Sequence, residues 1–554
     1  MAVLRNIRYA WCMSTKQAFE TKRIDHLGIV AGICHEVGLI DQINQAVGSS
    51  DRKVSCGAAV QALVLNGLGF TSRALYLMPQ YLDNKPVDLL VAPDLAAEDF
   101  NDDSLGRSLD QLFEAGVTEV FAQVAAQALR VYGLEHRFYH LDSSSFHLHG
   151  QYSAEEPQSE AIEITYGYSR EHRPDLKQVV VSLITGHRSQ LPVWMEALSG
   201  NSSDKESFPK TVQAFCQQLK AEQAVYFVVD SALYSAKNLQ TLGETRWLTR
   251  VPETLAEAKR LLAETDQGQM GELPDGYAYL EVPSHYGGIA QRWLVVYSSS
   301  AAQREEKTLL RRVEKEEKAA QKAWRQLAGQ IFNCREDAKV ALTEVQRRWK
   351  YHQAEAEATP LTRYPGPGRP AQGATPDVVG YQLQGEVRRN EVALENARHS
   401  LGRFVLATNE PDPQQLSAEG MLSQYKAQAI SVERGFRFLK DPLFFADSLF
   451  LKNPGRIMAL IMIMVLALLV YSLAERQLRL ALQQNAESIP DQKGRPTQNP
   501  TLRWVFQTFE GLDVLSVSVN GHRVLRQVLN MTPVHQKVLR LLGPQVGQCY
   551  LMAA

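Results

Sequence analysis

The chain has 554 residues, of which 45% are hydrophobic and 22% are charged, and its formal net charge at pH 7 is -2. This length exceeds what one ordinary hydrophobic core accommodates, so we expect two to four domains, and the composition excludes a disordered protein. The near-zero charge excludes a protein that is basic throughout, so any nucleic-acid-binding surface requires local clusters of basic residues. Six scattered cysteines without a CxxC pair argue against a zinc site and suit a reducing cytoplasm.

Residues 1–135 are predicted to form a helical domain. Met1 to Trp11 lacks the long apolar stretch of a signal peptide, and Met13 is an alternative start. Apolar residues then recur at helical spacing from Asp25, a plausible N-cap, as far as VFAQVAAQALRVYG. We expect this domain either to bind DNA or to serve in packing and dimerisation, because no recognition helix can be identified from the pattern.

From Phe138 the pattern changes to strands. Asp142 ends an apolar run (FYHLDSSSFHLHG), and the serines after it lead into a second predicted strand, so Asp142 is expected at the junction of two strands. A third strand is predicted over 176–185, a helix over 208–219, a fourth strand ending at Asp230, and a fifth over 246–251. Strand, strand, strand, helix, strand is the order of an RNase H-like core, whose first part is predicted to span 136–252.

The stretch between Asp230 and the helical segment near residue 430 is longer than such a core needs, so residues 253–400 are predicted to be an insertion. YAYLEVPS and QRWLVVYSS have the composition of strands, and Glu305 to about Glu357 is a highly charged helical stretch. That stretch is interpreted as a solvated helix or helical hairpin, with an arm that dimerises or lies on DNA as the alternative. A Pro/Gly-rich loop follows at 362–375.

Residues 401–480 are predicted to return to the core through the strand GRFVLATNE and the helix YKAQAISVERGFRFLK. Ile457 to Tyr471 is an unbroken nonpolar run, shorter than the roughly 20 residues of a membrane helix. A buried helix behind the sheet is therefore preferred to a membrane anchor. Residues 481–554 are predicted to be a linker and a small closing region, in which Arg503, Trp504 and Arg523 serve either DNA contact or packing.

Three carboxylates from distant parts of the chain are the candidate catalytic residues. Asp142 and Asp230 lie at predicted strand ends, and Glu433 lies on the basic, aromatic helical segment. Hard oxygen ligands of this kind hold Mg²⁺, and paired metal ions activate the attacking oxygen and stabilise the leaving oxygen in phosphoryl transfer.

Several long motifs carry a resemblance to a known family: LNGLGF, NDDSLGRSLD, GYSREHRPDLKQ, VVDSALYS and YKAQAISVERGFRFLKDPLF. With them the chain resembles DDE transposases of bacterial insertion sequences, in the IS4 group and its IS1634-like family. The resemblance implies an α/β fold, with an RNase H-like catalytic core, an all-helical N-terminal domain and a mixed β/helical insertion. It implies a cytoplasmic enzyme that cleaves and joins DNA at element ends, with Mg²⁺ (or Mn²⁺) bound by Asp142, Asp230 and Glu433. A homodimer is expected, without a nucleotide cofactor or membrane.

The family signature around the glutamate is a Tyr, an Arg, the Glu and a Lys. Tyr425, Glu433 and Lys440 match it, with the expected interval of seven from Glu433 to Lys440. The Arg position is unmatched, since Gln428 lies nearest, and Tyr425 is eight residues before Glu433 rather than seven. These departures leave a role for Gln428 in doubt.

Arg434 and Arg437 are expected to supply phosphate contacts in place of the missing Arg, together with Tyr425 and Lys440 as DNA-binding residues. In related transposases an inserted domain handles the hairpin near the cut end, and Trp293 is a candidate here for base stacking. Two alternatives stay open: an RNase H-like nuclease that cleaves without strand transfer, and a catalytically inactive DNA-binding protein.

Overall fold

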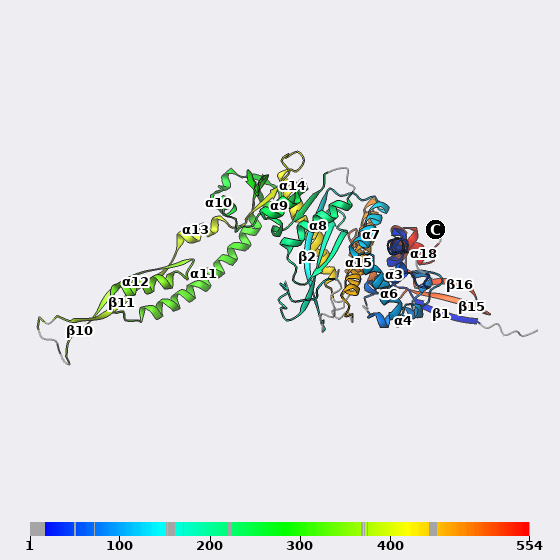
Figure 1. Ribbon diagram of the computed structural model, residues 1–554, viewed down its shortest axis with the longest axis horizontal. Coiled ribbons are helices and arrows are strands. Elements are labelled where there is room, and N and C mark those ends of the chain that lie inside the picture. The colour runs from blue at the N-terminus through cyan, green and yellow to red at the C-terminus, as the bar shows by residue number, and fades with distance from the viewer. Residues whose placement is uncertain are drawn as a thin grey trace, which may run out of the picture. The chain divides into compact units, whose positions relative to one another are not determined.

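The computed structural model describes residues 17–48, 51–70, 73–150, 152, 161–169, 171–219, 224–366, 369, 372–373, 375–441 and 451–552. The alternative start at Met13 lies outside these residues. Contacts divide the chain into two units (Figure 1). The first unit comprises residues 1–248 and 423–554, and the second unit comprises residues 249–422. The division of the chain into five domains, which the sequence analysis gave by residue range, stays a prediction.

The first unit begins with one strand and a series of helices, so the N-terminal region is not all-helical as expected, although its helical periodicity after the strand is confirmed. They are β1 (Gln17–Arg23), α1 (Leu27–Val37), α2 (Leu39–Val47), α3 (Cys56–Leu68), α4 (Met78–Asp83), α5 (Val87–Leu90), α6 (Asp102–Glu114) and α7 (Val117–Val131). Asp25 is not the N-cap of α1: His26 takes that position, and the Asp25 carboxylate accepts the Gly511 N–H at 2.8 Å instead. The expected cap was wrong because a tertiary contact claims this side chain.

A mixed sheet follows in the first unit. Its elements are β2 (Phe138–Leu148), β3 (Lys177–Gly186), β4 (Pro192–Ser199), α8 (Asp204–Gln218), β5 (Tyr226–Val229), α9 (Ala236–Leu242) and β6 (Arg246–Arg250). The strand order is β4-β3-β2-β5-β6; β2 pairs in parallel with β5 and antiparallel with β3. The protein is therefore an α/β protein with a large helical contribution.

The start of this sheet differs from the expectation in two places. Asp142 lies inside one continuous strand rather than between two, because Ser143 to Ser145 keep pairing with β3 and their side chains are buried. A run of serines that is typical of a turn is therefore accommodated in a strand. β4 was missed, although it is an apolar run that pairs with β3.

The first unit closes with two long helices and a C-terminal region. These are α14 (Ala418–Leu439, which starts in the second unit), α15 (Pro454–Gln484), β13 (Ile489–Pro490), β14 (Pro496–Thr497), α16 (Leu502–Thr508), β15 (Asp513–Val519), β16 (His522–Leu529), α17 (Pro533–Leu542) and α18 (Pro544–Cys549).

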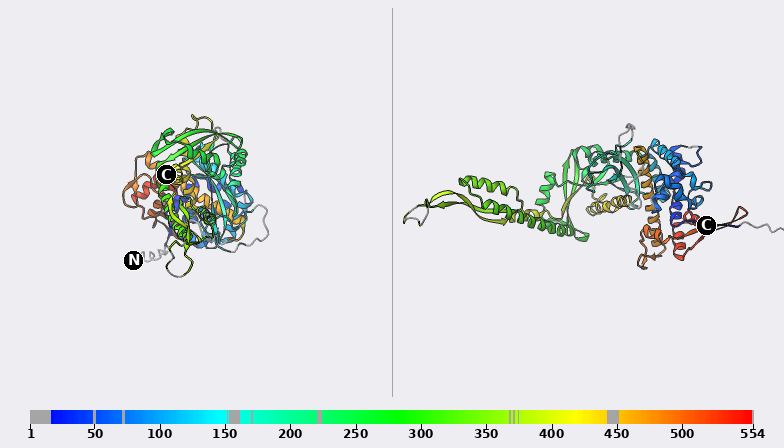
Figure 2. Two further views of the ribbon diagram at one scale, coloured as in Figure 1. Left: turned by 90° about the vertical axis from the view of Figure 1, so that its left-hand side faces the viewer. Right: turned by 90° about the horizontal axis from the view of Figure 1, so that it is seen from below.

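Helix α15 contains the apolar run and is the centre of the first unit's core. It packs against α3, α6 and α7 on one side and β4 on the other, as Figures 1 and 2 also show. It is the one described helix long and apolar enough to cross a membrane, and 72% of its most apolar window is buried inside the protein. The prediction of a buried helix is confirmed, since neighbouring helices cover it on several sides.

Two described segments that are about 500 residues apart in the sequence meet in the first unit. β1 pairs with β15, from Gln17 opposite Val519 to Arg23 opposite Asp513. Helix α1 crosses α18 so closely that a Cβ atom at Gly32 would lie 2.4 Å from the Cα atom of Val546. Glycine is therefore required here by the close approach of two helices.

The described part of the second unit contains two groups of paired strands and four α-helices apart from the start of α14. The elements are α10 (Ala256–Glu264), β7 (Gly271–Leu273), β8 (Tyr277–Tyr286), β9 (Ile289–Ser298), α11 (Ser299–Ala328), α12 (Arg335–Gln346), β10 (His352–Arg363), β11 (Asp377–Arg389), α13 (Glu391–His399) and β12 (Arg403–Thr408). One sheet part has the order β12-β9-β8-β7, and β10 with β11 forms a separate hairpin. Helices α11 and α12 pack along this hairpin (Figure 2).

Two expectations for the second unit are corrected. The charged helical stretch ends before residue 352, where β10 begins, because alternating small and charged residues suit a hairpin edge. Trp293 is not available for base stacking: its side chain is 1% exposed and its Nε1 donates to Gln291 Oε1 at 3.0 Å. It is a core residue of β9.

Candidate catalytic site

The two aspartates lie at the same level of neighbouring parallel strands: Asp142 is inside β2, and Asp230 directly follows β5. The register of β2 and β5 runs from Phe138 opposite Tyr226 to Leu141 opposite Val229. Asp142 and Asp230 occupy the next position on each strand, where neighbouring parallel strands are about 4.8 Å apart. The fold thus brings together two carboxylates that are distant in sequence.

Each aspartate is oriented by the backbone next to it. Asp142 Oδ1 accepts the Ser143 N–H at 2.8 Å, and Asp230 Oδ1 accepts the Ala232 N–H at 2.8 Å. Asp230 thereby caps a single 3-10 turn, Ser231–Leu233, that begins directly after β5. Both side chains are half-buried, so they combine a fixed orientation with access to solvent.

The two faces of the sheet are covered by different helices. Side chains alternate between faces along a strand, so Phe146 points to the same face as Asp142. Its ring packs against Phe436 of α14, with centroids 6.4 Å apart. On the other face, Tyr139 packs against Phe215 of α8, with centroids 5.0 Å apart. The Asp142 side chain therefore points to the face that α14 covers.

Buried polar contacts hold α14 against β2 beside Asp142. Gln428 Nε2 donates to the Leu141 carbonyl oxygen at 3.2 Å, and the Gln428 side chain is 8% exposed. One turn earlier, Gln424 Nε2 lies 3.2 Å from His187 Nε2, and His187 Nδ1 lies 3.0 Å from His140 Nε2. Burial lowers the pKa of His140 to about 3, so this histidine is neutral at pH 7.

This polar chain was missed from the sequence. His140, His187 and Gln424 come from three separate elements, and no motif links them. Gln428, whose role the family signature left in doubt, has a structural role, because it fixes the helix to the strand that carries Asp142.

Glu433 is not gathered with the aspartates. It follows Gln428 by five positions, which turns it about 140° around the helix from the side that contacts β2. Its side chain is exposed, whereas Val432 and Phe436 on either side are buried. Within the described part of the chain, no group of three or more His, Cys, Asp or Glu residues is arranged to hold a metal ion.

The four predicted DNA-binding residues all lie on or just after α14, in different environments. Tyr425 is half-buried and Arg437 is exposed. Arg434 forms an ion pair with Glu475 of α15. Lys440 Nζ lies 2.6 Å from Glu171 Oε1 and 5.4 Å from the centre of the Phe146 ring. The Lys440 contacts hold the pKa of Glu171 below its usual value although partial burial opposes this shift.

A comparison with protein families identifies the class of enzyme. Residues 133–470 match the family described as Transposase DDE domain, and residues 19–126 match a domain of unknown function, DUF4277. No curated protein matches the chain. Among solved structures, the chain is similar to one entitled "Cryo-EM structure of piggyBac transposase synaptic complex with hairpin DNA", at 9% identity and a TM-score of 0.36, covering 89% of this chain and 82% of that chain.

The assignment rests on the family match, which spans more than half of the sequence and contains β2, β5, α14 and most of α15. It contains Asp142, Asp230 and Glu433 and the four DNA-binding residues predicted around Glu433. The chain belongs to the DDE transposase domain family and is an enzyme that acts on DNA.

Proposed function

We propose that this transposase cleaves DNA at the ends of an insertion sequence and joins the freed ends to target DNA. The proposal includes an RNase H-like core and membership of the IS4 group, in its IS1634-like family. The observation that carries it is the pair of aspartates at the same level of two neighbouring parallel strands, with Asp142 on the face of the sheet that α14 covers.

The ligand chemistry of the two aspartates fits a divalent metal ion. Mg²⁺ is commonly bound by one or two carboxylates together with water and substrate phosphates, and Asp142 and Asp230 offer two such carboxylates side by side. When bound, the ion would polarise a phosphodiester and lower the pKa of an attacking water or 3′ hydroxyl. We propose Mg²⁺, with Mn²⁺ as a substitute, and Glu433 as the third acidic residue.

The chain's own residues position the DNA. Lys440 and Arg437 carry positive charge along α14 next to Glu433, so a phosphate near Glu433 would have cationic neighbours on one side. Gln428 and the His140–His187–Gln424 chain fix α14 on the sheet, and thereby the distance between these cations and Asp142. A homodimer is proposed because both element ends must be handled together.

The test is cleavage of labelled DNA from the ends of the element that encodes this chain, with Mg²⁺ present. Asp230→Asn should lower the cleavage rate by more than about 100-fold, since even residues that only support a metal ligand contribute 10- to 100-fold. Glu433→Gln should give a loss of similar size. Binding to the same DNA should persist in both variants, because neither change removes a positive charge.

The control is Glu419→Gln, which removes an exposed glutamate from the first turn of the same helix. It should cleave like the wild type. If Glu433→Gln also cleaves normally while Asp230→Asn does not, Glu433 is not the third acidic residue. Cleavage by Asp230→Asn at the wild-type rate would move the active site elsewhere. Cleaved ends that are never joined to target DNA would identify a nuclease instead.

A further inference from the structure

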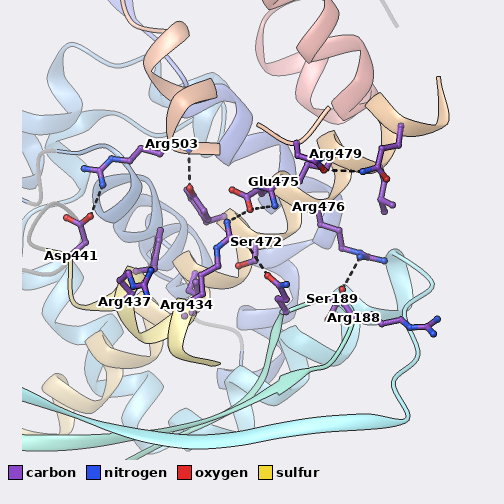
Figure 3. A pocket seen from close by; sticks show the side chains of 18 residues that line it. Arg188, Ser189, Arg434, Arg437, Asp441, Ser472, Glu475, Arg476, Arg479 and Arg503 are labelled. Atoms are coloured by element: carbon purple, nitrogen blue, oxygen red, sulfur yellow. Dashed lines mark hydrogen bonds and ion pairs between the residues drawn. The ribbon is translucent and has the colours of Figure 1, made fainter. Parts of the chain in front are cut away.

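A cavity of about 440 Å³ lies beside the C-terminal half of α14, between α14, α15 and the turn after β3 (Figure 3). Arginines dominate its charged lining: six arginines face two carboxylates, Asp441 and Glu475. The six are Arg188, Arg434, Arg437, Arg476, Arg479 and Arg503. A protein near neutrality overall therefore concentrates positive charge in one hollow.

The two carboxylates are already engaged. Glu475 is 5% exposed, and it pairs with Arg434 and, at 3.0 Å, with Arg479. Its second oxygen accepts the Leu502 N–H at 2.9 Å. Asp441 pairs with Arg503 at 2.8 Å. These contacts fix three guanidinium groups in place around the cavity.

The other three arginines have no carboxylate partner among the described residues. Arg476 donates to the Arg188 carbonyl oxygen at 3.4 Å, and the side chains of Arg188 and Arg437 are exposed. Partial burial lowers the pKa of Arg476, and burial likewise lowers the pKa of Arg479, because water solvates these cations poorly. An anion in the cavity would compensate this unbalanced charge.

The position of the cavity identifies the anion. Arg434 directly follows Glu433, and Arg437 lies one turn beyond it on the exposed side of α14. A DNA strand that passes Glu433 would therefore meet these arginines next. Guanidinium groups match the geometry of phosphate oxygens and bind them bidentately.

We propose that this arginine cavity binds the sugar–phosphate backbone of the DNA strand next to the cleaved bond. The inference rests on the proposed function, since it requires a DNA strand at Glu433. It adds Arg188, Arg476 and Arg479 to the DNA-binding surface, and it assigns Arg503, for which the sequence left DNA contact or packing open, to the same surface. The cavity positions the strand without reading its sequence, because phosphate contacts carry no base information.

The test is the salt dependence of DNA binding, measured without Mg²⁺ so that cleavage does not interfere. The double variant Arg188→Ala, Arg437→Ala removes two exposed side chains that no carboxylate holds, so the fold is preserved. Each lost phosphate contact should reduce the slope of log K against log salt concentration by about 0.9, hence by nearly 2 for the pair. Affinity should fall equally for element-end DNA and unrelated DNA.

The matched control is Arg260→Ala, Arg540→Ala, which removes the same charge from exposed positions outside the cavity. Its salt slope should equal that of the wild type. An equal slope in the cavity variant would overturn the proposal, even if Asp230→Asn abolishes cleavage as expected. Wild-type protein that fails to bind any DNA would instead overturn the proposed function, and the cavity assignment with it.

Discussion

Helices α15 and α11 have almost the same length, 31 and 30 residues, but they are built and covered differently. α15 has 17 buried residues, which point in all directions around its axis. α11 has four, Leu309, Val313, Ala320 and Leu327, and their spacing of four and then seven residues forms a single stripe.

The difference reflects what surrounds each helix. α15 has no charged residue from Ile457 to Ala474 and contacts helices and a strand on several sides. α11 packs its stripe on the β10–β11 hairpin and α13, and its other faces carry charged side chains. A long helix can thus be a core element or a one-sided support, and the distribution of apolar residues around the axis decides which.

The largest effect expected from this comparison is on stability. Leu466→Ala in α15 removes a side chain that is fully buried and should lower the free energy of unfolding by about 2 to 5 kcal/mol. Leu310→Ala in α11 removes a side chain that is 41% exposed and should change it by less than about 0.5 kcal/mol. Urea unfolding of both variants measures the difference, and equal losses would contradict the contrast between the helices.

A smaller effect is expected from pH on the core around α15. His26 is buried, with its Nε2 2.8 Å from the Leu68 carbonyl oxygen and its ring stacked on Phe506 at 4.3 Å. Burial lowers the pKa of His26 to about 4 from 6.5, so between these values the unfolded chain binds a proton that the folded chain does not. The free energy of unfolding therefore rises with pH through this range. Above pH 6.5 the destabilising effect of protonating His26 in the unfolded chain is absent.

At pH 5 this single group should lower the free energy of unfolding by about 2 kcal/mol relative to pH 7.5. His26→Gln keeps a side-chain donor but cannot titrate, so its stability should depend less on pH by that amount. Urea unfolding at the two pH values measures the effect. Identical pH dependence in variant and wild type would exclude His26 as its source.

The smallest effect concerns the charged side of α11. Arg398 Nε of α13 lies 3.2 Å from Glu306 Oε1, and both side chains are partly exposed. A double-mutant cycle with Arg398→Ala and Glu306→Ala should give a coupling energy below about 1 kcal/mol, declining further with added salt. A coupling of several kcal/mol would mean that the charged side of α11 contributes to stability as the buried stripe does.

Much of the first unit's element order could be predicted from sequence, partly through errors that compensate each other. Splitting β2 at Ser143 added a strand, and missing β4 removed one, so the predicted number of strands still matches, although α9 was not predicted. The serine run is polar, but in the fold its side chains are buried while its backbone pairs with β3. Local polarity alone does not reveal such an environment.

The candidate catalytic site could likewise be predicted from sequence only in part. An apolar run that ends in Asp identifies Asp142 and Asp230 from sequence, whereas the register that makes them neighbours comes only from the pairing of β2 with β5. The spacing of Val432, Phe436 and Leu439 already predicts a buried side of α14 that excludes Glu433. What that side contacts depends on residues more than 200 positions away, which no local pattern contains.

The pairing of β1 with β15 has a consequence for the order of events during synthesis. Gln17 and its partner Val519 are translated about 25 to 100 s apart at ordinary elongation rates of 5 to 20 residues per second. Throughout this interval α1 lacks α18, and the Asp25 backbone lacks the Tyr550 hydroxyl that donates to it. The N-terminal helices must therefore leave the ribosome with apolar surface uncovered, and a chaperone that shields them is expected to raise the yield of folded transposase.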